Sequence, residues 1–222
     1  MIERNQECWY KDVCKFPSCA SCVRFNEVKF LMEAANVPIA LRRPIPLYPY
    51  TPEDTKSFQQ LDLIKKDIKS FVDTGDNLYI CSNYAGTGKT SWAIKLLLKY
   101  FDVIWPENSR DTRALFVHVP TLMTKLKDFA NTNVDEYRQQ IIDVDLVVWD
   151  DIATADKLSS YEYSQLLMLL DARLNAGRAN IYTSNITSLD DLSSKLGARL
   201  ASRIYNLSLI IEFTAIDNRQ RH

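Results

Sequence analysis

The residues best suited to chemistry lie in a small-residue loop between an apolar run and a segment with helical spacing. The loop closes on Gly88, Lys89 and Thr90. In the pattern G-x-x-x-x-G-K-[ST], backbone N–H groups bind phosphate oxygens, the lysine reaches the β- and γ-phosphates, and the hydroxyl binds Mg²⁺. The sequence therefore predicts a nucleotide site, for ATP in preference to GTP. The expected contacts are Asn83, Ala85, Gly86, Thr87, Gly88, Lys89, Thr90, Ser91 and Asp150.

One position departs from this phosphate-binding pattern. The first glycine of the motif should stand at position 83, where the chain has Asn83. Asparagine enters the left-handed backbone region at lower cost than most residues, so it can replace glycine there. A chance glycine-rich turn is the alternative, but the strand, the loop, the Lys-Thr pair and the helix together favour a phosphate site.

Two further predicted strands end in polar side chains. The apolar run 146–149 precedes Asp150 and Asp151, and the strand 180–185 ends in Thr183, Ser184 and Asn185. Apolar runs of this kind are typical of parallel strands, whose carboxyl ends are where ligands bind. We expect Asp150 to hold Mg²⁺ through water, Asp151 to orient or deprotonate the attacking water, and Asn185 to contact the γ-phosphate or that water. A polar turn and a helix cap are the alternatives.

Four of the five cysteines lie within the first 22 residues, at Cys8, Cys14, Cys19 and Cys22. Four thiolates suit tetrahedral Zn²⁺, and so short a segment needs a metal in place of an apolar core. We therefore expect a zinc site, with free thiols as the alternative. Cys81 precedes the phosphate loop and is expected to be a small core residue.

The elements that must position these residues follow from hydrophobic periodicity. Apolar runs predict strands near residues 78–82, 115–120, 146–149, 180–185 and 209–213, and helical spacing predicts helices near 23–36, 61–71, 90–101, 121–129, 134–142 and 161–175. This alternation predicts an α/β fold with a mostly parallel central sheet. We divide the chain into a cysteine-rich module (1–36), a proline-rich linker (37–57) and a nucleotide-binding domain (58–222).

Composition limits the classes of protein to consider. The chain has 222 residues, 46% of them hydrophobic, and a net charge of −1. A near-neutral chain exerts no long-range attraction on nucleic acid, so any DNA contact needs a local basic patch or several assembled subunits. Neither a secretory segment nor a continuous apolar run of membrane-spanning length is visible. We expect a cytoplasmic protein, of a bacterium or of a phage-infected cell.

Four motifs, taken in order, resemble those of the AAA+ helicase loaders of the DnaC/DnaI type. They are Gly86-Thr-Gly-Lys-Thr90, Val147-Val-Trp-Asp-Asp151, Thr183-Ser-Asn185 and the pair Arg199 and Arg203. The similarity covers about residues 37–222, and the cysteine cluster resembles the zinc-binding, helicase-contacting module of DnaI-type loaders. Here the module is more compact and has no histidine ligand.

The resemblance implies a role for each matching residue. Asp150 and Asp151 become the Walker B pair, and Asn185 becomes sensor 1. Arg203 matches the arginine finger that reaches the nucleotide of a neighbouring subunit, with Arg199 as the second candidate. Such an arginine spreads positive charge over the γ-phosphate in the transition state. The family's lid domain and its sensor 2 arginine are not expected here, although Arg219 could contact nucleotide.

The resemblance also implies partners. It predicts an assembly- and DNA-dependent ATPase that self-assembles with ATP, binds a hexameric replicative helicase and contacts single-stranded DNA during initiation of replication. Lys125, Lys127 and Phe129 are the residues that would contact DNA, through charge and base stacking. A solvated helix face is an equally good interpretation of these lysines.

Three alternatives share parts of this pattern. A transposase-helper ATPase of the IstB kind has the same core, but would act on duplex DNA and need no zinc module. A small-molecule phosphotransferase would need an arginine-bearing lid, for which no insertion is large enough. A non-hydrolysing adaptor that titrates a helicase is disfavoured by the intact Lys89, Asp150 and Asp151.

The phosphate-loop assignment makes a direct prediction. Lys89→Ala removes the ammonium that would reach the β- and γ-phosphates, so it is expected to abolish nucleotide binding. The measurement is titration calorimetry with ATP. Unchanged ATP affinity would refute the assignment.

Overall fold

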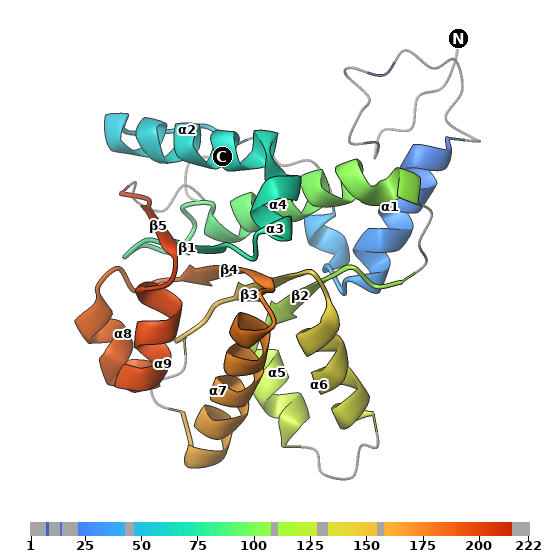
Figure 1. The fold of residues 1–222 in the computed structure, drawn as a ribbon. Helices are drawn as coiled ribbons and strands as arrows, with labels where there is room; N and C mark the ends of the chain where they lie inside the picture. Colours follow the sequence, from blue (N-terminus) through green and yellow to red (C-terminus); the bar gives the residue numbers. More distant parts are fainter. Residues whose placement is uncertain are drawn as a thin grey trace.

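The computed structural model describes residues 8, 14, 22–42, 47–107, 111–127, 133–154 and 158–214 (Figure 1). The strands are β1 (Asn77–Cys81), β2 (Ala114–His118), β3 (Leu146–Asp150), β4 (Ala179–Ser184) and β5 (Leu209–Glu212). The α-helices are α1 (Val23–Ala34), α2 (Pro52–Lys66), α3 (Ile68–Asp73), α4 (Lys89–Ile104), α5 (Val119–Leu126), α6 (Val134–Asp143), α7 (Ser160–Asn175), α8 (Leu189–Leu196) and α9 (Ala198–Tyr205). Short 3-10 helices are η1 (Ile39–Leu41) and η2 (Trp105–Glu107). None of the helices in these ranges is long and apolar enough to cross a membrane.

The five strands form one sheet in the order β2-β3-β4-β1-β5, and each pair of neighbours is parallel. This confirms the expected α/β fold with a parallel sheet. Because β4 lies between β1 and β3, the carboxyl ends of these three strands are adjacent. Strands that are distant in sequence therefore bring their polar ends to one edge of the sheet.

Alternate residues of each strand face opposite layers of helices. In β1, Leu78 and Ile80 belong to the core beneath α1 to α4, whereas Tyr79 and Cys81 belong to the core that α5 to α9 cover. Figure 1 shows these helices on the two sides of the sheet. Cys81 is fully buried, as expected for a small core residue.

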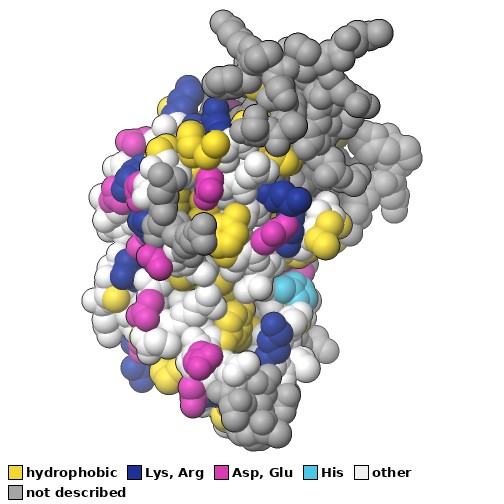
Figure 2. Space-filling model, turned by 90° about the vertical axis from the view of Figure 1, so that its right-hand side faces the viewer, with side chains coloured by type: hydrophobic (Ala, Val, Ile, Leu, Met, Phe, Trp, Pro, Cys, Tyr) yellow, Lys and Arg dark blue, Asp and Glu magenta, His cyan; other side chains and the backbone are white. Residues whose placement is uncertain are grey.

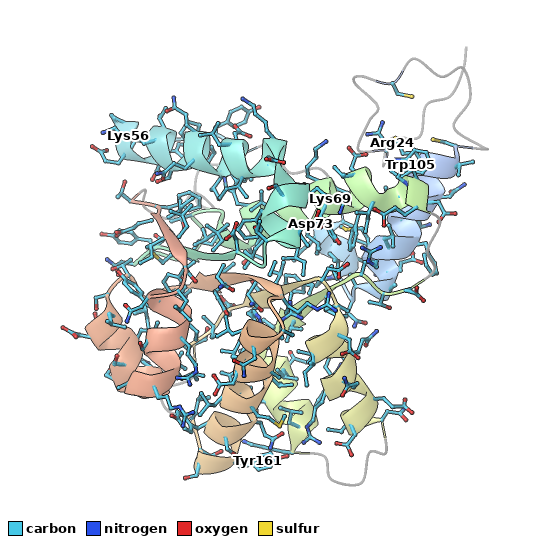
Figure 3. All side chains as sticks on the ribbon, in the orientation of Figure 1. Arg24, Lys56, Lys69, Asp73, Trp105 and Tyr161 are labelled. Atoms are coloured by element: carbon cyan, nitrogen blue, oxygen red, sulfur yellow. The ribbon has the colours of Figure 1, made fainter. Side chains whose placement is uncertain are left out.

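Helix α1 packs into the same core as the sheet. Val28, Leu31 and Met32 are buried together with residues of α4, and Arg24 donates through Nε to Asp102 Oδ1 at 2.7 Å (Figure 3). The carbonyl of Ala35 accepts a bond from the N–H of Phe116 at 2.7 Å, so the chain after α1 covers the edge of β2. The boundary expected after residue 36 therefore does not coincide with a break in packing.

Two predicted elements have different limits in the structure. Helix α2 begins at Pro52, inside the expected linker, because proline suits the first helical position and Thr51 caps the helix by accepting the Asp54 N–H at 2.9 Å. The helix expected at 61–71 is interrupted at Asp67, where α2 ends and α3 begins.

At the end of α7, Gly177 adopts φ 62°, the left-handed geometry expected of a glycine there.

A buried arginine ties the amino ends of the strands to the helices. Arg173 of α7 is fully buried, and its guanidinium donates to Asn180 Oδ1 and to the carbonyls of Ile141, Val144 and Ala179 at 2.6–2.8 Å. Burial lowers the pKa of Arg173 to about 9, which leaves it charged at neutral pH. Sequence periodicity does not reveal this residue, because an arginine in a helix is normally exposed.

Replacing Arg173 with leucine is expected to reduce the free energy of unfolding by about 3 kcal/mol or more, because several buried carbonyls lose their donor. Urea denaturation measures the loss. Lys69→Ala is the control, since Lys69 pairs with Asp73 on the surface of α3 at 2.8 Å (Figure 3) and should contribute less than about 1 kcal/mol. Equal losses in the two variants would contradict this role of Arg173.

Candidate functional site

The phosphate loop joins β1 to α4 through residues 82–88. Gly86 and Gly88 adopt φ values of 73° and 96°, a region that favours glycine. Gly88 is also the N-cap of α4, so the loop delivers the chain directly into the first turn of a helix of 16 residues. Free backbone N–H groups and the positive end of the helix dipole make this turn a site for anions.

The expectation that Asn83 replaces glycine in a left-handed backbone conformation is wrong. Among the described non-glycine residues, a positive φ occurs at Asn36, Asp151 and Ala153, and Asn83 is not one of them. The Asn83 carboxamide oxygen instead accepts a hydrogen bond from the Thr187 hydroxyl at 3.1 Å, which joins the segments that follow β1 and β4. Because φ at Asn83 is not positive, glycine is not needed at this position.

Lys89 lies folded over the loop. Its side chain is 6% exposed, and Nζ donates to the Tyr84 carbonyl at 2.8 Å and to Thr87 Oγ1 at 3.5 Å. An anion stabilises a buried ammonium, because the charge is costly to remove from water. The geometry thus places a cation above the helix terminus, ready to contact phosphate oxygens.

Asp150 is the buried carboxylate of the site. It ends β3 and is 5% exposed, and its Oδ1 accepts bonds from Thr90 at 2.7 Å and Thr183 at 2.8 Å. Burial raises the pKa of Asp150, and the two hydrogen bonds offset only part of that effect. Oδ2 has no hydrogen-bond partner among the described residues. A hydroxyl and a carboxylate oxygen are ligands that Mg²⁺ prefers, so Thr90 and Asp150 fit this ion, directly or through water.

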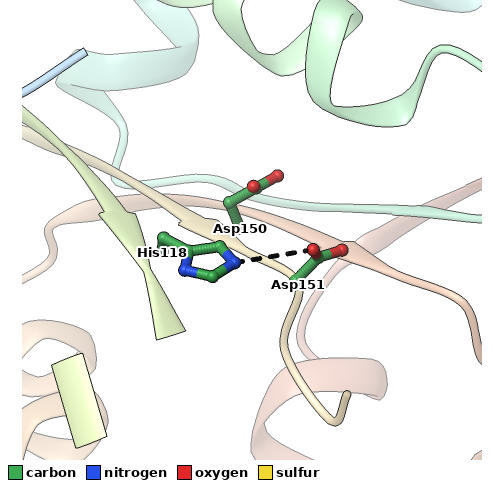
Figure 4. Close-up of side chains that lie close together, drawn as sticks. All are labelled: His118, Asp150 and Asp151. Atoms are coloured by element: carbon green, nitrogen blue, oxygen red, sulfur yellow. Dashed lines mark ion pairs between the residues drawn. The ribbon is translucent and has the colours of Figure 1, made fainter. Parts of the chain in front are cut away.

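Asp151 turns out of the sheet next to Asp150. Its φ is 57°, and its backbone N–H donates to Thr183 Oγ1 at 3.0 Å, so the Thr183 hydroxyl is bonded to both aspartates. The Asp151 side chain is 37% exposed, and its Oδ2 lies 3.7 Å from His118 Nε2 (Figure 4). This arrangement leaves the Asp151 carboxylate accessible to water while its backbone is held in place.

His118 is a site residue that the sequence reasoning missed. It ends β2 opposite Asp150 in the strand register, and its Nδ1 is 2.8 Å from Thr121 Oγ1 on α5. One ligand atom each of His118, Asp150 and Asp151 lie within 4.8 Å of one another. The available signal was a histidine near the end of a predicted parallel strand, but the strand was expected to continue to residue 120.

A pocket of about 420 Å³ brings these elements together. Its size suits a small ligand. The lining residues are Leu41, Ala85, Gly86, Thr87, Gly88, Lys89, Thr90, Ser91, Asp151 and Asn185. Residues predicted from three separate segments, namely 85–91, Asp151 and Asn185, therefore surround one hollow, whereas the predicted contacts Asn83 and Asp150 do not line it. Leu41, from η1, adds an apolar wall that the sequence did not reveal.

The two candidate arginines are not part of this pocket. Arg203 donates through Nε to Asp171 Oδ1, and Arg199 Nη2 lies 3.5 Å from Asp171 Oδ2. Both arginines belong to α9, and Asp171 belongs to α7. Arg219 lies outside the described residues.

The predicted zinc ligands are not gathered into a metal site in the described part of the chain. Among the described residues, Cys8, Cys14 and Cys22 do not form a group with metal-ligand spacing. Cys19 lies outside the described residues. The zinc site stays a prediction.

The lysines expected to contact DNA have partners within the chain. Lys127 forms an ion pair with Glu162 at 3.0 Å, and Lys125 Nζ lies 5.2 Å from the centre of the Tyr137 ring. Phe129 lies outside the described residues. The face drawn in Figure 2 carries cationic and anionic side chains interspersed rather than one field of positive charge.

Comparison with known proteins rests on the fold, since no family model and no curated protein matches the chain. The structure is similar to the crystal structure of the DnaC helicase loader, with a TM-score of 0.63 and 18% identity over 75% of this chain and 93% of that one. For the crystal structure of DnaI the TM-score is 0.58, with 21% identity over 85% and 93% of the two chains. For the replication initiator DnaA bound to AMPPCP and single-stranded DNA it is 0.57, with 15% identity over 78% and 50%.

The chain therefore has the fold of the DnaC and DnaI helicase loaders, with a phosphate loop between β1 and α4. The resemblance expected from the sequence is therefore confirmed at the level of the fold.

The raised pKa of Asp150 gives a prediction with a defined sign. A carboxyl whose pKa is higher in the folded than in the unfolded state stabilises the fold at low pH, and this contribution is lost as pH rises through the folded-state pKa. Asp150→Asn carries no charge at any pH. Its free energy of unfolding should therefore increase relative to wild type as pH rises from 4 to 8, by about 1.4 kcal/mol for each pKa unit of the shift.

Urea denaturation at a series of pH values, without divalent cations, measures this difference. A constant offset added to this increase reports altered hydrogen bonding and does not affect the prediction. If the difference in free energy of unfolding stays the same from pH 4 to 8, the prediction is wrong.

Proposed function

We propose that this chain hydrolyses ATP at the pocket between β1, β3 and β4. The observation that carries the proposal is the convergence of Lys89, Thr90, Asp151 and Asn185 on one hollow, with Asp150 bonded to Thr90. These residues come from three strand ends, and each has a chemical part in hydrolysis. A site for binding alone would not need the accessible second carboxylate of Asp151.

Each residue of the site has a separate role in the proposed hydrolysis. Backbone N–H groups of 86–90 and the Lys89 ammonium bind the β- and γ-phosphates. Thr90 and Asp150 would hold Mg²⁺, directly or through water, and the ion would supply positive charge against the negative charge that develops on the phosphates. Asp151 orients the attacking water and accepts its proton, and Asn185 hydrogen-bonds that water or the γ-phosphate.

Hydrolysis in this pocket needs further positive charge to stabilise the transition state. Lys89 is the only lysine or arginine among the described residues that line it. We infer that Arg203 of a second copy supplies the missing charge, with Arg199 as the second candidate. An arginine supplied in trans makes hydrolysis depend on ATP-driven assembly.

We further propose that the client is a hexameric replicative helicase, loaded during initiation of DNA replication in the cytoplasm of a bacterium or a phage-infected cell. The likeness of the fold to DnaC and DnaI supports this client. In this proposal residues 1–36 contact the helicase and hold zinc through Cys8, Cys14, Cys19 and Cys22. Residues 37–57 link that segment to the ATPase domain, 58–222.

Single-stranded DNA is the proposed second ligand. The DnaA structure of similar fold was determined with single-stranded DNA, which supports an assignment to the same class of ligand. Lys125 lies near the carboxyl end of α5 and Lys127 directly after it, and the first turn of the same helix contacts His118 through Thr121. With a net charge of −1 the single chain attracts DNA weakly, so we expect binding to require an assembly of several copies.

Arg203→Ala tests the role proposed for the arginine. ATP affinity of the monomer should stay unchanged, because Arg203 lies outside the pocket of its own chain. Hydrolysis that depends on protein concentration should fall on the order of 10³-fold, as for other arginines supplied in trans. Steady-state ATPase assays over a range of protein concentrations measure this, and lost affinity in the monomer would assign Arg203 a structural role.

Native mass spectrometry with ATP and a replicative helicase tests the proposed client, because one spectrum reports zinc, nucleotide and partner stoichiometry. We expect a zinc-loaded complex of this chain with the helicase hexamer. Absence of any complex with replicative helicases would overturn the loader assignment and leave the ATPase proposal standing.

A further inference from the structure

One carboxylate holds both candidate arginines. Asp171 Oδ1 accepts a bond from Arg203 Nε, and Asp171 Oδ2 pairs with Arg199 Nη2 at 3.5 Å. Arg203 Nη1 also donates to the backbone carbonyl of Arg199 at 3.3 Å. Two arginines one helical turn apart on α9 are thus tied to a single residue of α7.

This pairing conflicts with the role proposed for Arg203. A guanidinium that uses Nε and Nη1 within its own chain has fewer donors to aim at phosphate oxygens of another. The Arg203 and Asp171 side chains are each 28% exposed, so the pair lies at the surface, where a neighbouring molecule can reach it. Surface ion pairs are weak, and a ligand with higher negative charge competes for the same donors.

We propose that Asp171 is a latch that restrains Arg203 in the isolated chain and releases it to the triphosphate of a second copy. The surface formed by Asp171, Arg199 and Arg203 is then the face that docks against the nucleotide pocket of a neighbour. ATP in that pocket carries more negative charge than one carboxylate, so it draws Arg203 away from Asp171. This inference rests on the proposed function, because it assumes that Arg203 acts in trans.

Asp171→Asn tests the latch, because asparagine keeps the shape and an acceptor oxygen but removes the charge. The ATPase rate is measured against protein concentration. The concentration for half-maximal rate should fall about two- to fivefold, the range expected from losing one surface ion pair. The rate at saturating protein concentration should stay the same, because the released state is unchanged.

A matched control comes from another carboxylate that holds two cations. Asp102 pairs with Arg24 and, at 3.3 Å, with Lys99, and it belongs to α4. Asp102→Asn makes the same change in net charge and should leave the half-maximal concentration unaltered. Thermal unfolding of every variant is measured first, and Asp171→Ser replaces Asp171→Asn if the latter does not fold.

The double variant separates failure of the latch from failure of the proposed function. Association with ATP is measured by sedimentation velocity. Introduced into the wild-type chain, Asp171→Asn should increase association; introduced into the Arg203→Ala variant, it should have no effect. If Arg203→Ala keeps full concentration-dependent hydrolysis, the role of Arg203 in trans is wrong and the latch with it. If Arg203→Ala loses hydrolysis but Asp171→Asn leaves the half-maximal concentration unchanged or raises it, the latch alone is overturned.

Discussion

The buried carboxylate of Asp150 is the constraint on which the site depends. A charged group at 5% exposure is costly unless hydrogen bonds compensate, and here hydroxyls from α4 and β4 both reach Oδ1. Thr90 brings the start of the phosphate-loop helix to β3, and Thr183 brings β4. One oxygen atom therefore joins three segments, two of which are also paired in the sheet. Because the two hydrogen bonds compensate the burial of the carboxylate only in part, its second oxygen suits a cation.

The Thr183 hydroxyl extends this constraint to the accessible half of the site. It donates to Asp150 and accepts the backbone N–H of Asp151, whose φ of 57° would otherwise be unfavourable for an aspartate. The backbone at Asp151 is thus held while its carboxylate stays accessible in the pocket. His118 lies 2.8 Å from Thr121 on α5 and 3.7 Å from the Asp151 carboxylate, so a displacement of α5 would change the surroundings of Asp151.

Sequence patterns predicted the parts of the site that are local, and missed those that depend on strand order. The phosphate loop and the polar strand ends are short motifs, so their residues could be named without a fold. The role of His118 follows from β2 lying beside β3, and that of Thr183 from β4 lying between β3 and β1, which periodicity does not determine. Asn83 shows the opposite error, since the motif position was recognised and its backbone conformation was misjudged. Arg173 was missed because burial of a charge is decided by tertiary packing alone.

The interactions of this chain differ in strength in a way that suits a switch. Contacts that build the pocket are buried and carry several hydrogen bonds, so removing them should cost about 1–3 kcal/mol each. The ion pairs of Arg199 and Arg203 with Asp171 are partly exposed, and pairs of this kind contribute about 0–1 kcal/mol. A docking neighbour can therefore rearrange the arginines at little cost while the nucleotide pocket keeps its shape. Dependence of hydrolysis on assembly then needs no large conformational change, only the exchange of one carboxylate partner for a phosphate.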